Sequence, residues 1–116
     1  MSFILTDVDG VIVNYEGDLR QGTFGLIQGL ALLDYEIVVW SGNGEEYARQ
    51  AAKRVGLPDT TRCFAKPSFP VRLDDALELL GSVPALQLDD DPTEHVADWP
   101  FLYVPCAGEM HGRTAK

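Results

Sequence analysis

Residues 3–11 read Phe-Ile-Leu-Thr-Asp-Val-Asp-Gly-Val, and this stretch decides the fold. Its apolar start predicts a short strand that is buried on both faces, as strands of parallel sheets are. The strand runs directly into Asp7 and Asp9, and Gly10 follows as a turn residue. Two acids directly after a buried strand indicate that polar side chains, which can bind ligands or react, lie at the carboxyl edge of the sheet.

Outward from this stretch, apolar strands and amphipathic helices alternate along the chain. The spacing predicts further strands at residues 37–40, 62–65, 84–88 and 101–104. It predicts helices at residues 21–33, 45–55, 71–80 and 92–97, although three glycines weaken the first by about 1 kcal/mol each. This order predicts an α/β fold, a Rossmann-like doubly wound sandwich of three layers around a five-stranded parallel sheet.

Length and charge limit the class of protein. The chain has 116 residues, of which 46% are hydrophobic, so it can form one domain with a real core. Its 18 acidic and 9 basic residues give a net charge of −9. That balance disfavours broad binding to nucleic-acid phosphates or anionic lipid, and it permits binding of cations.

The two cysteines and the chain ends bear on compartment and domain organisation. Cys63 and Cys106 are too few for a disulfide framework. The start lacks the features of a signal peptide, and no apolar run approaches the ~20 residues that span a bilayer. We therefore expect a reduced, cytoplasmic protein without a membrane partner, with a core at residues 1–105 and a flexible tail at residues 106–116.

Polar groups follow four of the predicted strands, at the same edge of the sheet. They are Asp7 and Asp9, then Ser41, then Lys66, then Asp89–Asp91. Each alone has an ordinary structural explanation, as a turn residue, a surface lysine or a helix cap. Together they predict one cleft, where gathered carboxylates repel one another and a divalent cation would offset the repulsion. Oxygen ligands without His or Cys favour Mg²⁺.

The order and type of these residues resemble the haloacid dehalogenase (HAD) superfamily of phosphatases. Its first motif, Asp-x-Asp-x-Thr/Val, is met by residues 7–11, with Val11 where threonine is commoner. Its second motif, a Ser or Thr after an apolar strand, is met by Ser41, and its third, a Lys, by Lys66. Asp89-Asp90 meets the acidic pair of the fourth motif, so the resemblance extends from Phe3 to about Val104.

The resemblance implies a mechanism. Asp7 would be the nucleophile that forms an aspartyl-phosphate, and Asp9 would protonate the leaving oxygen and then activate water. Ser41 would hydrogen-bond a phosphoryl oxygen, and Lys66 would neutralise charge on the phosphoryl group and on Asp7. The expected activity is that of a Mg²⁺-dependent phosphomonoesterase, a hydrolase acting on a small phosphorylated metabolite or nucleotide.

The resemblance also implies a ligand set for Mg²⁺. The ion would bind the Asp7 carboxylate, the backbone carbonyl of Asp9 and the acidic pair of Asp89 and Asp90, with Asp90 as the principal ligand. Three aspartates in a row leave the register of that pair open. Glu94, further along, could hold a metal-bound water.

No cap domain is expected. Only the stretch 11–21 separates the first motif from the first helix, which is enough for a flap but not for a domain. An uncapped cleft is open to bulky substrates, or a second subunit closes it. Candidate substrate contacts are Gly10, Gly42, Asn43, Tyr15 and Arg20, with Asn43 equally able to shape the turn only.

Two alternatives remain open. The first is a phosphatase for polynucleotide ends, against which the net charge counts. The second is a non-catalytic phosphoacceptor or binding module. Receiver domains carry their acidic pair after the first strand, their phosphorylated Asp after the third and their Lys after the last, so the order here fits a phosphatase better.

The remaining polar and aromatic residues are predicted to be structural, and the charge is predicted to be local. We expect Trp40 in the core, and His95 and His111 as structural or exposed residues. Six acids are placed at or beside the cleft: Asp7, Asp9, Asp89, Asp90, Asp91 and Glu94. Without them, 12 acids face 9 bases, a net charge of −3. The objection to nucleic acid weakens accordingly, and the case for a cation strengthens.

Overall fold

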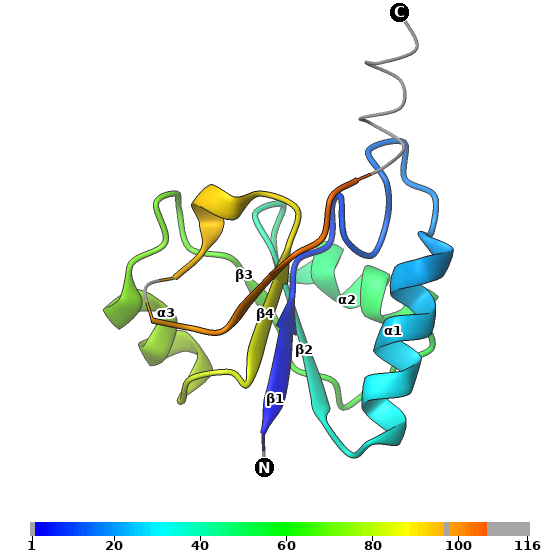
Figure 1. Ribbon diagram of the computed structural model, residues 1–116, viewed down its shortest axis with the longest axis horizontal. Coiled ribbons are helices and arrows are strands. Elements are labelled where there is room, and N and C mark those ends of the chain that lie inside the picture. Colours follow the sequence, from blue (N-terminus) through cyan, green and yellow to red (C-terminus); the bar gives the residue numbers. More distant parts are fainter. Residues whose placement is uncertain (1, 97, 107–116) are drawn as a thin grey trace, which may run out of the picture.

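Five parallel strands form the centre of the molecule, in the order β3-β2-β1-β4-β5 (Figure 1). The computed structural model describes residues 2–96 and 98–106. The strands are β1 (Phe3–Thr6), β2 (Glu36–Ser41), β3 (Cys63–Ala65), β4 (Leu86–Asp89) and β5 (Phe101–Tyr103). The predicted α/β class and five-stranded parallel sheet are thereby confirmed.

Helices cover both faces of this sheet. They are α1 (Gln21–Leu32), α2 (Glu45–Arg54) and α3 (Leu73–Leu80). Because strand side chains alternate between faces, Ile4 of β1 joins Ile27 of α1 and Ala51 of α2 in one buried cluster. Its neighbour Leu5 joins Ala76 of α3 in a second cluster. Accordingly, α3 lies on the opposite side of the sheet from α1 and α2 (Figure 1).

The predicted elements match the structure to within two residues, with one exception. The helix predicted at residues 92–97 is wrong in type and length, since the structure has a 3₁₀ turn at Pro92–Glu94. Asp91 caps this turn by accepting hydrogen bonds from the backbone N–H and hydroxyl of Thr93. The backbone of His95 is already extended, so the turn cannot continue as a helix. The last predicted helical residue, Ala97, lies outside the described residues.

Trp40 and the cysteines are core residues. Trp40 is fully buried in the cluster under α3, which confirms its predicted place. Cys63 and Cys106 are both buried free thiols. Residues 107–116, which include His111 and nearly all of the predicted tail, lie outside the described part of the chain. None of the helices described is both long and apolar enough to cross a membrane.

The segment after β1 belongs partly to the core. Val11, Ile12 and Val13 are buried and pack with α1 and α2, so only the second half of the predicted flap is exposed. The segment holds isolated bridges and turns, and no cap domain stands between Gly10 and α1.

The strand order fixes where a ligand can bind. From β1 the chain proceeds to β2 and β3 on one side, and it returns to β4 and β5 on the other. The carboxyl ends of β1 and β4 therefore border the crevice at which the direction of winding reverses. Open α/β sheets bind their ligands at such a crevice.

Candidate functional site

A cleft of about 330 Å³ opens at the carboxyl ends of β1 and β4. It is lined by Asp7, Asp9, Tyr15, Lys66, Asp89, Asp90, Asp91 and Glu94. All eight were singled out from the sequence, and they come from the three segments at the ends of β1, β3 and β4. The parallel sheet brings them together because the ends of its strands meet at one edge.

Lys66 is the cation at the centre of the cleft. Its Nζ lies 2.8 Å from a carboxylate oxygen of Asp89, 2.8 Å from one of Glu94 and 3.8 Å from one of Asp7. Its side chain is only 6% exposed, and its Nζ lies 5.6 Å from the centroid of the Trp40 ring. Burial alone would lower the pKa of Lys66, but the charges of Asp7 and Asp89 raise it above the usual value. Lys66 therefore stays charged.

The surroundings of Asp7 disfavour its charged form. Burial raises its pKa to about 7, and the neighbouring charge of Asp89 adds to the effect against the opposing attraction of Lys66. The side chain of Asp89 is fully buried, and burial likewise raises its pKa. Asp89 uses one oxygen for Lys66 and the other to accept the backbone N–H of Asp91 at 3.0 Å. The sequence predicted repulsion among the acids, but burial contributes more than repulsion to the raised pKa values of Asp7 and Asp89.

Three carboxylates lie close enough to share one metal ion. One oxygen each of Asp7, Asp89 and Asp90 lies within 4.8 Å of the others. Gly10, whose φ is +80°, packs directly against this group, since a Cβ there would lie 2.2 Å from Oδ2 of Asp90. The donors are all hard oxygens, which suits Mg²⁺. The residues present therefore fit the predicted ion.

Asp9 has a different environment, although it lies only two residues from Asp7. The Nδ2 of Asn43 donates a hydrogen bond to one Asp9 oxygen at 2.7 Å, and the hydroxyl of Tyr47 donates to the other at 2.5 Å. The bond to Asp9 raises the pKa of Tyr47 to about 12, so this residue remains a neutral phenol. Both partners of Asp9 are thus uncharged donors.

Tyr47 is the site residue that the sequence reasoning missed. It lies in the first turns of α2, a helix that begins at the same edge of the sheet at which β2 ends. No motif marks it. The only available signal was its place at the start of the helix that follows Ser41.

Ser41 and Gly42 shape the turn after β2. Ser41 is buried and does not line the cleft, and its Oγ accepts the backbone N–H of Asn43 at 3.0 Å. The backbone carbonyl of Ser41 accepts the N–H of Lys66 at 2.8 Å. Gly42 is exposed in the turn. Asn43 therefore shapes this turn through its backbone and binds Asp9 through its side chain, while its contact with substrate stays a prediction.

The two flap residues have different places. Tyr15 is half-exposed and lines the cleft, and its contact with a substrate stays a prediction. The guanidinium of Arg20 donates instead to the backbone carbonyls of Gly10 and Pro105, the latter at 2.7 Å. Arg20 thereby ties the loop after β1 to the segment after β5. Its contact with a substrate also stays a prediction.

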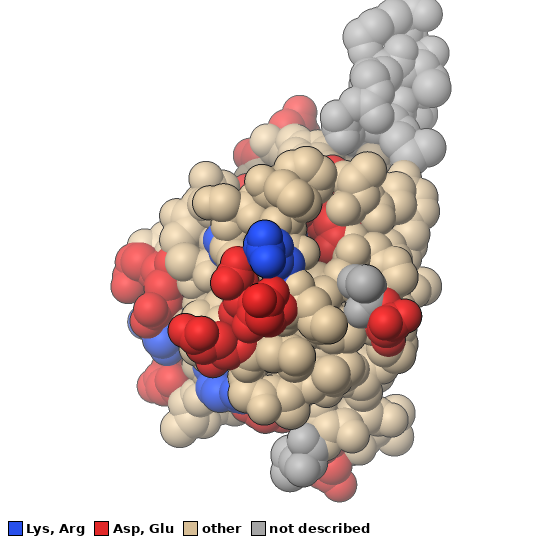
Figure 2. Space-filling view, turned by 90° about the vertical axis from the view of Figure 1, so that its left-hand side faces the viewer, with Lys and Arg blue, Asp and Glu red and all other residues tan. Residues whose placement is uncertain are grey.

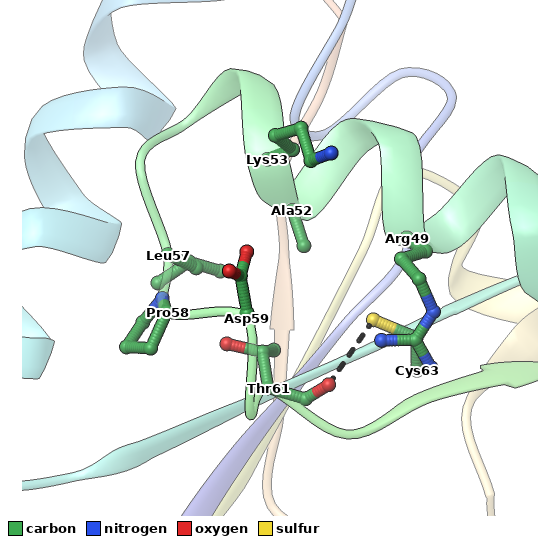
Figure 3. A pocket seen from close by; sticks show the side chains of 8 residues that line it. All are labelled: Arg49, Ala52, Lys53, Leu57, Pro58, Asp59, Thr61 and Cys63. Carbon is green, nitrogen blue, oxygen red and sulfur yellow. Dashed lines mark hydrogen bonds between the residues drawn. The ribbon is translucent and has the colours of Figure 1, made fainter.

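A second hollow, of about 260 Å³, lies beside α2 (Figure 3). Its lining is Arg49, Ala52, Lys53, Leu57, Pro58, Asp59, Thr61 and Cys63. The Cys63 thiol donates a hydrogen bond to the Thr61 carbonyl, and burial raises its pKa, which makes it a poor nucleophile. This hollow has no residue in common with the acidic cleft.

Negative charge also lies outside the cleft. On the side of the molecule where α3 lies, acidic side chains gather in groups and outnumber basic ones (Figure 2). The helix α3 itself carries Asp74, Asp75 and Glu78. This surface offers no basic stripe for a nucleic acid.

Comparison with known proteins adds no relative. No protein-family model matches the chain, and no curated protein is significantly similar to it. The functional inference therefore depends on the geometry of the cleft and on the order of its residues along the chain.

Proposed function

We propose that this protein is a Mg²⁺-dependent phosphomonoesterase with a HAD-like fold, acting through an aspartyl-phosphate on Asp7. The observation that carries the proposal is the cluster of Asp7, Lys66, Asp89 and Asp90 at the winding reversal of the sheet. A nucleophilic carboxylate, a fixed cation and further oxygen ligands are the groups that phosphoryl transfer needs in one place.

The reaction would proceed in two displacements. An oxygen of Asp7 attacks phosphorus and the bond from phosphorus to the ester oxygen breaks, while Asp9 gives its proton to the leaving alkoxide. Water then attacks phosphorus, its proton passes to Asp9, and the bond from phosphorus to Asp7 breaks. The products are an alcohol and inorganic phosphate, and both aspartates return to their initial states. Such proton transfer is typically worth 10²–10⁴-fold in rate.

The other groups stabilise charge. Lys66 is held by Asp89 and Glu94, and it lies 3.8 Å from Asp7, where it would attract the phosphoryl oxygens. Asp7, Asp90 and the carbonyl of Asp9 would hold Mg²⁺, with Asp89 beside them. When bound, the ion offsets the repulsion between a carboxylate nucleophile and an anionic phosphate. The resemblance implies that the Ser41 hydroxyl binds a phosphoryl oxygen, but Ser41 is buried outside the cleft lining and its Oγ accepts the backbone N–H of Asn43, so that role stays a prediction.

The topology supports this function over a receiver-like phosphoacceptor. Receiver domains have the strand order 2-1-3-4-5, whereas this sheet has the order 3-2-1-4-5. In addition, Lys66 follows β3 and not the last strand. Both differences agree with the order of the motifs along the chain.

The cleft supports a small substrate. Its volume of about 330 Å³ suits a phosphorylated metabolite or a nucleotide, at the lower end of ordinary ligand sites. The acidic surface disfavours polynucleotide ends, which we retain as the second candidate substrate. We place the protein in the cytoplasm, in agreement with its two free thiols.

The experiment is a panel of phosphate esters, including 4-nitrophenyl phosphate, assayed with Mg²⁺ and again with EDTA. We expect hydrolysis of at least one ester, and its loss on chelation. A panel without turnover, together with no binding of Mg²⁺ by calorimetry, would overturn the proposal in favour of a binding module. Measuring the mass of the protein in solution decides whether a second copy is present that could close the cleft.

A further inference from the structure

Asp7 and Asp9 lie two residues apart and line the same cleft, but they differ in their contact with the cation Lys66. Lys66 contacts Asp7, and through Asp89 and Glu94 it is already surrounded by carboxylates. Asp9 lines the same cleft, but no ion pair joins it to Lys66. Instead, it accepts one hydrogen bond on each oxygen, from Asn43 and from Tyr47.

These two hydrogen bonds act against an electrostatic attraction. A flexible carboxylate at the rim of the cleft would turn toward Lys66, or toward a cation held by the neighbouring aspartates, because opposite charges attract strongly in a partly buried site. Neutral donors can oppose that movement without adding charge. Asn43 and Tyr47 both belong to the segment that follows β2, so they hold Asp9 from a part of the chain other than the segments of Lys66 and Asp89.

The two donors differ in how firmly they are held. Asn43 lies in the exposed turn after β2, whereas Tyr47 is half-buried in α2. The helix is fixed against the core, because Ala48, next to Tyr47, is fully buried. Tyr47 is therefore the better anchored of the two donors.

We propose that Tyr47, assisted by Asn43, is a positioning residue that holds Asp9 apart from the cation-binding carboxylates and directed at the leaving group of the substrate. This inference rests on the proposed phosphatase function. It assigns to Tyr47 no contact with the phosphoryl group itself.

The test compares two esters of similar shape in Tyr47→Phe, which loses only the hydroxyl. Phenyl phosphate releases a basic phenoxide that needs a proton, whereas 4-nitrophenyl phosphate releases a stable anion that does not. We expect kcat/KM for phenyl phosphate, which reports the attack of Asp7 and not the later hydrolysis shared by both esters, to fall about 10- to 100-fold, part of the full worth of general acid catalysis. For 4-nitrophenyl phosphate the loss should stay below about 3-fold, since little proton transfer is needed. Tyr35→Phe, the same change on an exposed tyrosine before β2, should alter neither.

A double-mutant cycle supplies a readout that does not depend on turnover. Tyr47→Phe should lower the Tm of the metal-free protein by about 4 °C, and it should lower it by much less in an Asp9→Ala background, where the hydrogen bond is already lost. The same background should abolish the further effect of Tyr47→Phe on kcat/KM.

The outcomes separate the two claims. Equal losses on both esters, or no loss on phenyl phosphate, in a protein whose wild type is active would overturn the positioning role and leave the phosphatase in place. Additive Tm shifts would overturn the contact itself. If the wild-type protein with Mg²⁺ hydrolyses neither ester nor any other member of the panel, the proposed function fails and the role of Tyr47 in it fails too.

Discussion

Asp7 and Asp9 lie two residues apart, yet their surroundings differ in kind. Asp7 is largely buried and shares one cation with two other carboxylates, and burial raises its pKa to about 7. Asp9 is held by two neutral donors, Asn43 and Tyr47. Two chemically identical side chains can take different catalytic roles when their environments differ in this way. The contrast agrees with the two different roles proposed for Asp7 and Asp9, since a cation bound beside Asp7 would keep this buried carboxylate ionised.

The largest effect should come from Asp7, the proposed nucleophile. Asp7→Asn keeps the shape of the side chain but removes its nucleophilic charge, so turnover should fall by at least about 10³-fold, as when an essential nucleophile is lost. The measurement is kcat on the best ester of the panel, with circular dichroism as the control for folding. Near-wild-type activity in a folded variant would show that Asp7 is not the nucleophile. The proposed difference in role between Asp7 and Asp9 would then be wrong.

Lys66→Met tests the buried side of the comparison through stability. The change leaves Asp7, Asp89 and Glu94 without their cation, and breaking a buried ion pair from one side typically costs about 3–5 kcal/mol. Urea denaturation in EDTA measures the loss, and added Mg²⁺ should restore part of it. Lys53→Met, on the exposed face of α2, is the matched control and should stay within about 0.5 kcal/mol. Equal costs for the two variants would contradict the central role of Lys66.

Gly10→Ala should disturb the three carboxylates through Asp90, the nearest of them to Gly10. A methyl group at this position would lie 2.2 Å from Asp90, and φ is +80°. Gly17→Ala is the matched control, because its φ is +91° but no atom lies within 4 Å of the added carbon. Both should lose about 1–2 kcal/mol from backbone strain, and only Gly10→Ala should weaken Mg²⁺ binding in calorimetry. Equal Mg²⁺ affinities would show that Gly10 does not support the proposed metal site.

The smallest effect is the dependence of stability on pH. Because the folded pKa of Asp7 lies near 7 and its ordinary value is 3.8, the folded state binds the proton more tightly. That contribution to stability is fully present below about pH 4 and is lost as the pH rises through 7. In EDTA, Asp7→Asn should therefore be more stable than the wild type at pH 8, by on the order of 1 kcal/mol, with the difference gone near pH 4. A difference that does not change between these pH values would contradict the burial of Asp7 as its cause.

Some of the site could be predicted from local pattern, and some could not. Asp7, Asp9, Lys66 and the acidic pair follow predicted strands, and strand ends of a parallel sheet share one edge. The helix predicted at residues 92–97 is wrong. Pro92 stands at a favourable first position, but the segment forms only a turn capped by Asp91, because the backbone at His95 is extended. Tyr47 belongs to no motif, and its place near the start of α2 did not reveal its contact with Asp9, because that contact depends on the rotation of α2 against the sheet.

The sequence by itself determined the class of fold and the chemistry available at one edge of it. Alternating apolar strands and helices require a covered parallel sheet, and the order of the polar residues follows the order of the strands. Only the tertiary structure decided how those residues divide into groups: Asp7 with Lys66, Asp89, Asp90 and Glu94, and Asp9 with Asn43 and Tyr47. The physical reason is that burial, distance and the direction of each donor depend on packing between segments far apart in the chain, which no local pattern encodes.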